Sequence, residues 1–337
     1  EPEPGRTNEA HVREMAEWCC AHGIATKGHP LVWHEAVPAW AEALGDDAAR
    51  RRLRDRVTDL VSGYRGLVNT WDVINEATVS HRYDNVVGRW VREKGAIAVV
   101  SELVRLAREA NPDAELLYND FNLRCPDFFI APARPDCDLL IEGLLDAGVR
   151  IDALGLQSHM HTRTWSLDEA LNVCDFYAQR GIPLHFTELT VLSGRPKDPK
   201  ELDWSSRHAD WRSTPEGEAA QAEYGEALYT VLFSHPAVEA ITWWDFADYD
   251  AWQGAPSGLI RADMTPKPLY DRLQKLIRGD WASRYDGVLS GAGANDVTVR
   301  CVAGQHAVEV MLPSGDTLAG AFTVAKEQTG PVTVALA

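Results

Sequence analysis

The sequence predicts an α/β fold, a (β/α)8 barrel of the TIM type, and two observations lead to it. From residue 7 to about 278, short apolar runs alternate with amphipathic stretches of helical period, a pattern typical of parallel strands connected by helices. The apolar runs also end in polar, aromatic or acidic residues. In a barrel the carboxyl ends of all strands open on one face, where active sites are built. A doubly wound sheet is the alternative, but it usually carries a Gly-rich phosphate-binding turn, which we do not find.

Six strands are expected within this alternating region. In chain order their last residues are His34, Glu76, Phe121, His159, Glu188 and Asp245. The helices between them carry apolar residues three and four positions apart. In the first helix Val12, Met15, Ala16 and Cys19 form such a face. Ser166 and Glu169 form a capping box that opens the helix before the fifth strand.

A closed (β/α)8 barrel needs two strands more than these six. Residues 1–6 lead directly into the first helix, so the missing pair is expected to precede residue 1. An open barrel would expose two strand edges and part of its apolar interior. We therefore expect either a fragment of a longer protein or a second polypeptide that supplies the missing N-terminal strands.

The chain is expected to divide into two parts. Residues 1–284 form the barrel domain, which is incomplete at its N-terminus. After about residue 284 the helical period ends, and apolar and polar residues alternate at 297–300, 307–311 and 332–334. Such alternation is typical of antiparallel strands with one solvated face. Residues 285–337 are therefore predicted to form a small antiparallel β module that packs on the barrel or on a partner.

Charge and hydropathy exclude several classes of partner. The 33 basic and 50 acidic residues give a net charge of −17, which argues against nucleic acid and anionic membranes because both need clustered Lys and Arg. No apolar run is long enough to span a bilayer. The first residues do not form a signal peptide, but a mature secreted chain would have lost one, and we expect a secreted or extracytoplasmic protein. Cys125 and Cys137 flank a Pro-rich loop, and the sequence leaves open whether they pair.

Two carboxylates, Glu76 and Glu188, each end an apolar strand. A charged group there is costly unless it faces a polar cleft, although two unrelated salt bridges would give the same pattern. Hydrolysis of a glycosidic bond with retention needs one protonated acid and one ionised nucleophile about 5–5.5 Å apart. Two carboxylates so close cannot both ionise freely. We therefore expect one of the two to be protonated and the other charged, with a bell-shaped pH profile.

Residues 1–278 resemble the family-10 glycoside hydrolases, the endo-β-1,4-xylanases whose acid/base follows an Asn. The resemblance is carried by six motifs in the family's order, at 27–34, 71–77, 155–159, 186–189, 243–252 and 266–270. It implies that Glu76 protonates the leaving oxygen and then acts as base on water. It also implies that Glu188 forms the glycosyl-enzyme intermediate, and that Asn75 hydrogen-bonds the 2-hydroxyl of the sugar undergoing reaction.

Further roles come from the same resemblance and from the chemistry of the side chains. His159 is expected to orient the nucleophile, His34 to bind a sugar hydroxyl and Gln157 to position groups between the two carboxylates. Trp244 and Trp252 are expected to stack on sugar rings, because pyranose faces are apolar and flat indoles suit them. Core packing is the alternative for both tryptophans.

No cofactor or metal is expected. His159 and His161 alternate on one strand, so they would share a face, but no third ligand is evident for a catalytic metal. The expected substrate is xylan or its oligosaccharides, a neutral polymer that suits the acidic chain.

The sequence departs from the family at three places. Nothing matches the Glu-Asn-x-x-Lys-Trp motif of the family's second strand, which binds sugars on the glycone side. Thr190 stands where many relatives have Asp, and Asp245 stands where Gly is usual. Two alternatives stay open. The first is another β-1,4-glycanase, acting on cellulose or mixed-linkage glucan. The second is a non-catalytic carbohydrate-binding protein, which the incomplete barrel suggests.

Overall fold

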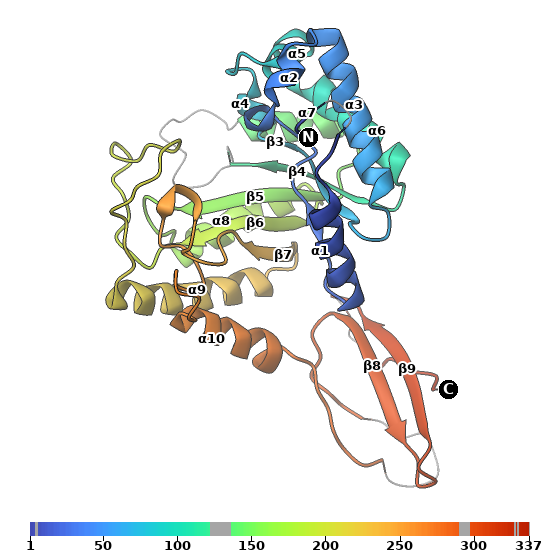
Figure 1. Ribbon diagram of the computed structural model, residues 1–337. Coiled ribbons are helices and arrows are strands. Elements are labelled where there is room, and N and C mark those ends of the chain that lie inside the picture. The colour runs from blue at the N-terminus through green and yellow to red at the C-terminus, as the bar shows by residue number, and fades with distance from the viewer. Residues whose placement is uncertain (4–5, 122–135, 290–296, 327, 329, 337) are drawn as a thin grey trace.

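A computed structural model describes residues 1–3, 6–121, 136–289, 297–326, 328 and 330–336 (Figure 1). A parallel sheet lies at its centre with helices packed on the outside, and a β hairpin projects from one end. None of the helices in the described ranges is long and apolar enough to cross a membrane. Cys125 of the possible pair with Cys137 lies outside the described residues.

The sheet has seven strands, all parallel, in the order β1-β3-β4-β5-β6-β7, with β2 also pairing with β3. The strands are β1 (Lys27–Gly28), β2 (Val32–Trp33), β3 (Thr70–Asn75), β4 (Glu115–Asp120), β5 (Ala153–Met160), β6 (Leu184–Val191) and β7 (Val238–Trp243). Pro30 splits the first predicted strand into β1 and β2 because proline cannot donate to a ladder. The six predicted strand positions and the barrel-type α/β fold are thereby confirmed.

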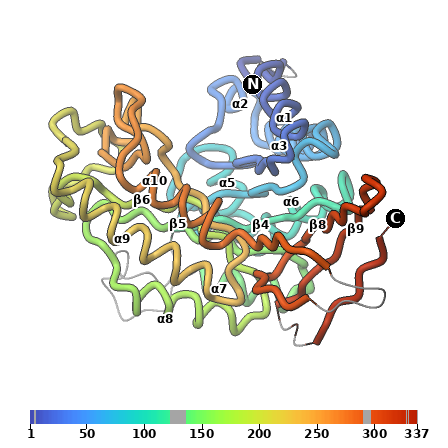
Figure 2. Tube along the Cα trace, turned by 90° about the horizontal axis from the view of Figure 1, so that it is seen from below, coloured from blue at the N-terminus to red at the C-terminus, as the bar shows by residue number. Residues whose placement is uncertain are grey.

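The helices run between the strands and cover the outer side of the sheet. Their bounds are α1 (Ala10–Ala21), α2 (Ala39–Glu42), α3 (Asp46–Gly63), α4 (Ala77–Ser80), α5 (Val86–Lys94), α6 (Ala96–Ala110), α7 (Asp136–Asp146), α8 (Leu167–Ala178), α9 (Pro215–Ser234) and α10 (Pro268–Lys275). Ser166 and Glu169 make the predicted capping box at the start of α8. Figure 2 shows α8 and α9 along the outside of the sheet, where they pack against each other.

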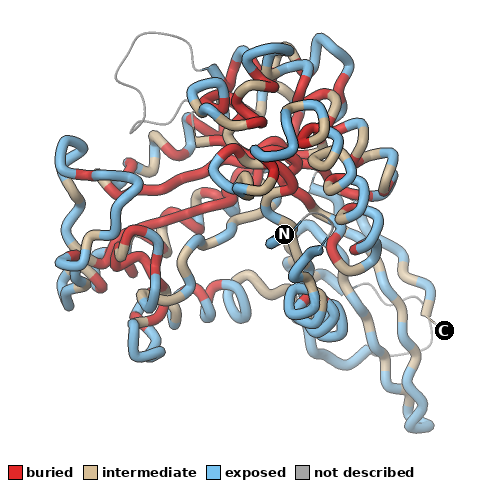
Figure 3. The backbone as a smooth tube through the Cα atoms, turned by 45° about the horizontal axis from the view of Figure 1, so that its top comes forward, coloured by how far each residue is buried: buried red, intermediate tan, exposed pale blue. Residues whose placement is uncertain are grey.

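The core lies where the middle of the sheet meets the helices (Figure 3). Every residue of β5 and β6 is buried, because these strands have a neighbour on both sides and helices on the outer face. The end strand β7 is only partly buried along its length. Burial therefore decreases towards the end of the sheet formed by β7.

The apolar face predicted for the first helix is fully buried only at Ala16. Val12 and Met15 on α1 are 54% and 56% exposed, and Ala16 is the helix's buried residue. The physical reason is the position of the helix: α1 leads into β1, a two-residue strand that pairs only with β3 among the described residues. No further strand in the described ranges offers this face a surface to pack on.

The C-terminal part holds an antiparallel hairpin of β8 (Gly304–Met311) and β9 (Thr317–Val324). The alternation at 307–311 lies in β8 as predicted. The runs at 297–300 and 332–334 form no strand, so that part of the prediction is wrong. Val334, Ala335 and Leu336 lie against β9 beside Gly320 without forming a ladder. Lys326 Nζ donates to Pro236 O at 2.6 Å, just before β7.

Candidate active site

Glu76 follows directly after β3, at the carboxyl end of the sheet. Its backbone is left-handed, with φ 55° and ψ 44°, a conformation that costs a non-glycine residue energy and often marks a functional site. Its Oε1 accepts from Gln157 Nε2 at 2.9 Å and from Asn75 Nδ2 at 3.1 Å, and its Oε2 accepts from Trp33 Nε1 at 3.0 Å. Burial raises the pKa of the Glu76 carboxyl to about 7, with the nearby Asp120 and Glu188 carboxylates acting in the same direction.

Glu188 lies within β6 and is buried. Its Oε1 accepts from Asn119 Nδ2 at 2.8 Å, and its Oε2 lies 3.0 Å from His159 Nε2. The other ring nitrogen of His159 is 2.9 Å from Thr190 Oγ1. Thr190, the residue that departs from the family pattern, thus holds the imidazole that contacts Glu188, because a second hydrogen bond fixes the orientation of the ring.

Asn75 and Asn119 join the two carboxylates through their amides. Asn119 Nδ2 donates to Asn75 Oδ1 at 2.9 Å as well as to Glu188, while Asn75 Nδ2 donates to Glu76. Thr187 Oγ1 donates to Asn119 Oδ1 at 2.6 Å. No role is predicted for Asn119 from the sequence. A polar residue near the end of a predicted strand was the signal that could have singled it out, and in the structure it lies opposite Asn75 in the parallel register of β3 and β4.

His34 lies beside the proposed acid, as the sequence reasoning expects of a site residue. Its Nε2 is 3.9 Å from Glu76 Oε2, and its Nδ1 is 2.9 Å from Ser80 Oγ. Burial lowers the pKa of His34 to about 4, so the ring is neutral at ordinary pH. Nε2 is buried and has no hydrogen-bond partner among the described residues.

Trp244 and Trp252 both lie near the imidazole that contacts Glu188. Their ring centroids are 5.8 Å and 4.8 Å from that of His159, and each side chain is 37% exposed. A fully packed core residue would expose far less. The structure therefore brings together the two carboxylates, the two amides, both histidines and both tryptophans predicted for the site.

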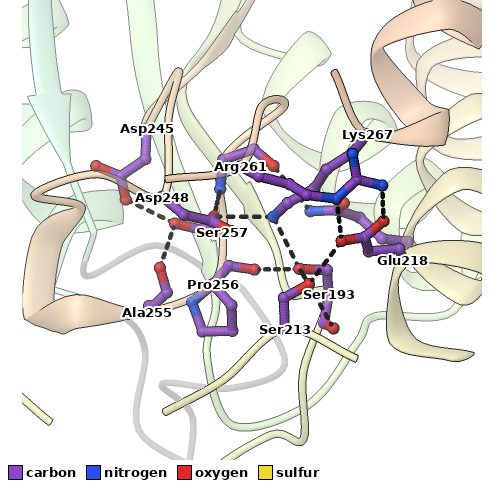
Figure 4. A network of polar contacts seen from close by, with 12 residues as sticks. Ser193, Ser213, Glu218, Asp245, Asp248, Ala255, Pro256, Ser257, Arg261 and Lys267 are labelled. Carbon is purple, nitrogen blue, oxygen red and sulfur yellow. Dashed lines mark hydrogen bonds and ion pairs between the residues drawn. The ribbon is translucent and has the colours of Figure 1, made fainter. Parts of the chain in front are cut away.

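A network of polar contacts joins Asp245, Asp248, Ser257 and Lys267 (Figure 4). Asp245 Oδ1 accepts from the backbone N–H of Trp252 at 3.2 Å, and its Oδ2 accepts from Ser257 Oγ at 2.7 Å. Burial raises the pKa of the Asp245 carboxyl. The aspartate found where the family usually has glycine thus anchors the segment that carries Trp252.

Lys267 is the fully buried cation of the same network, and its Nζ donates to Asp248 Oδ1 and to Ser193 Oγ, both at 2.8 Å. Replacing Lys267 by alanine is expected to lower the free energy of unfolding by about 3 kcal/mol, because it removes a fully buried cation and leaves Asp248, whose side chain is only 14% exposed, without its counter-ion. Urea unfolding measures this change. Exposed Lys275 on α10, replaced by alanine, is the control, and a loss below about 1 kcal/mol for Lys267→Ala would contradict the expectation.

The fold and the site define a glycoside hydrolase. Glu76, with a raised pKa, and Glu188, held by an amide and an imidazole, lie towards the carboxyl ends of β3 and β6, two parallel strands of one sheet, beside partly exposed indoles. Glycoside hydrolases typically place two carboxyl groups in different surroundings in this way.

Comparisons with known proteins identify the family. A family model described as "Glycosyl hydrolase family 10" matches residues 1–276, and the chain belongs to this family. It is 30% identical to endo-1,4-beta-xylanase B of Paenibacillus barcinonensis over 71% of this chain and 70% of that one. It is 28% identical to an endo-1,4-beta-xylanase of Geobacillus stearothermophilus over 81% and 83%. Xylanase 10B of Thermotoga petrophila RKU-1, solved with xylobiose, has the same fold, with a TM-score of 0.67, 24% identity and coverage of 83% and 82%.

Proposed function

We propose that the protein is a retaining endo-β-1,4-xylanase that hydrolyses internal linkages of xylan by double displacement. The observation that carries the proposal is the different state of two neighbouring carboxyls. Burial raises the pKa of Glu76 to about 7, whereas Glu188 faces the imidazole of His159, whose Nε2 is 3.0 Å from Glu188 Oε2. One environment favours a proton donor and the other an anionic nucleophile. The similarity to proteins named endo-1,4-beta-xylanase supports xylan over cellulose or mixed-linkage glucan.

In the first step Glu188 attacks the anomeric carbon, and the bond to the leaving oxygen breaks as Glu76 gives that oxygen its proton. The Glu188 ester carries no charge, so the pKa of Glu76 falls and its carboxylate becomes a base. In the second step Glu76 takes a proton from water, the resulting hydroxide equivalent attacks the same carbon, and Glu188 leaves as a carboxylate. Two inversions at one carbon give net retention.

The remaining site residues position the sugar and the carboxylates. We propose that the 2-hydroxyl of the reacting sugar takes over the Asn75 contact now made with Glu76, and that it is held more strongly in the transition state. Gln157 keeps Glu76 in place and His159 does the same for Glu188. Trp244 and Trp252 stack on sugar faces. His34 hydrogen-bonds a sugar hydroxyl through Nε2, which has no partner among the described residues.

The anomeric configuration of the first product tests the mechanism. Proton NMR during hydrolysis of xylohexaose is expected to show the β-anomer of the new reducing end before mutarotation. Initial release of the α-anomer would contradict double displacement. An exo-acting enzyme would release xylose or xylobiose from the start, whereas internal cleavage gives intermediate lengths and a rapid fall in xylan viscosity.

A further polypeptide segment is proposed to complete the barrel between β7 and β1, either a separate peptide or an adjoining part of a longer chain. Both strands pair on one side only among the described residues. The exposed apolar face of α1 and the partial burial of β7 are consistent with a missing neighbour. Xylan lies outside cells, so we also propose an extracytoplasmic place of action.

Intact mass spectrometry of active, purified protein tests the completing segment. We expect either a second peptide long enough for two strands or a single longer chain. Full xylanase activity from a sample that contains residues 1–337 alone would contradict the proposal.

A further inference from the structure

The segment between β6 and α9 packs against the loop that carries Trp252. Gln253 Nε2 donates to Trp204 O at 3.0 Å, and the backbone N–H of His208 donates to Gln253 O at 2.7 Å. Arg207 also pairs with Asp250 at 2.9 Å. Gln253 itself has a positive φ of 58°, and a non-glycine residue keeps such a conformation only where its surroundings fix it. The backbone of Trp204 is therefore fixed relative to Trp252.

The two indoles form one continuous aromatic surface. The ring centroids of Trp204 and Trp252 are 5.6 Å apart with their planes tilted by 32°, and Trp204 is 37% exposed, as Trp252 is. His161 is fully buried behind them, with its ring centroid 5.5 Å from Trp204 and 5.2 Å from Trp252. Burial holds the pKa of His161 well below its usual range, so the ring is neutral and supports both indoles without adding a charge.

This surface extends the site away from the nucleophile. His159 contacts Glu188, and the ring centroid of Trp252 is 4.8 Å from that of His159. Trp204 lies next to Trp252. Neighbouring exposed indoles keep apolar area in contact with water, and such patches commonly mark binding surfaces. The apolar faces of successive pyranose units in a neutral chain match this arrangement.

We propose that Trp204, together with Trp252, forms a further sugar-binding subsite, which takes a pyranose unit of a β-1,4-linked chain more remote from the scissile bond than the unit beside His159. The inference rests on the proposed function and extends it, because it makes affinity depend on chain length. A short oligosaccharide that does not reach Trp204 gains nothing from it. Trp204 then acts in ground-state and transition-state binding alike, so its loss raises KM and leaves kcat unchanged.

The kinetic test compares Trp204→Ala and Trp204→Phe with the unaltered protein on xylotriose and xylohexaose. Trp204→Ala is expected to raise KM for xylohexaose about tenfold, the loss that one aromatic stacking contact produces, with kcat and the kinetics on xylotriose unchanged. Trp204→Phe should recover most of the affinity. Tyr285→Ala is the control, because Tyr285 is an exposed aromatic side chain after the barrel, 56% accessible and outside the site.

Two outcomes would overturn the subsite. One is an unchanged KM for xylohexaose in Trp204→Ala. The other is an equal loss on both oligosaccharides, which would mean that Trp204 only supports the Trp252 loop. Calorimetric binding of xylohexaose to Glu188→Ala, with and without Trp204→Ala, separates this inference from the proposed function. Binding that depends on Trp204 in a protein that hydrolyses no xylan would contradict the xylanase proposal and support the subsite.

Discussion

Replacing Glu188 by alanine is expected to reduce xylan hydrolysis by about 10⁴- to 10⁶-fold, the range found when a covalent nucleophile is removed. The group lost is the carboxylate that Asn119 and His159 hold in place. Binding of xylo-oligosaccharides should persist, because the indoles and amides of the site remain. Reducing-sugar release measures the loss, and calorimetry measures the binding. Glu223→Ala on α9, an exposed glutamate, is the control.

Chemical rescue makes the assignment of Glu188 specific. Azide fits the space left by the removed carboxylate and should attack the anomeric carbon of an aryl β-xyloside with a good leaving group. The product would be the α-xylosyl azide, since the reaction has one inversion. Normal xylan hydrolysis by Glu188→Ala, or a β-azide from this variant, would show that another residue is the nucleophile.

Replacing Glu76 by alanine is expected to slow xylan hydrolysis by about 10²- to 10⁴-fold, the contribution of a general acid. The first step on an activated aryl xyloside should be spared, because its leaving group needs no proton. The second step still lacks its base, so a burst of phenol followed by a slow steady state is expected. Stopped-flow absorbance resolves the two phases, and Glu109→Ala on the exposed face of α6 is the control.

The pH dependence of kcat/KM tests the role of Glu76 independently. Burial raises the pKa of Glu76 to about 7, and the first step needs the protonated form. For xylan, kcat/KM of the unaltered protein should therefore fall as pH rises through about 7. In Glu76→Ala this fall of kcat/KM at alkaline pH should disappear for the activated substrate. If the fall persists in the variant, another group causes it.

Much of the fold and the site could be predicted because the signals are local. Each strand is a short apolar run, and Glu76 and Glu188 are acidic residues at or near strand ends, so their positions on one face follow from parallel topology. The roles expected of Asn75, Gln157 and His159 come from the family resemblance of the motifs that contain them. The structure then adds the hydrogen bonds that connect them.

Other features depend on contacts that the sequence does not encode locally. The strand β9 contains Ala319, Gly320 and Ala321, whose small side chains hide the alternation, and it forms because the turn at 312–316 places it beside β8. The left-handed backbone of Glu76 leaves no mark in residue type. Asp245 stood out only as a departure from the family, and its bond to the Trp252 backbone became visible in three dimensions.

The amide bridge between the carboxylates has a direction. Asn119 Oδ1 accepts the Thr187 hydroxyl, which leaves the Asn119 NH2 group to point towards Glu188 and Asn75. Asn75 then accepts at its oxygen and presents its own NH2 group to Glu76. Both carboxylates consequently receive N–H groups, and neither meets a carbonyl oxygen that would repel it. The side-chain hydroxyl of one β6 residue, Thr187, thus fixes which end of each amide faces a carboxylate.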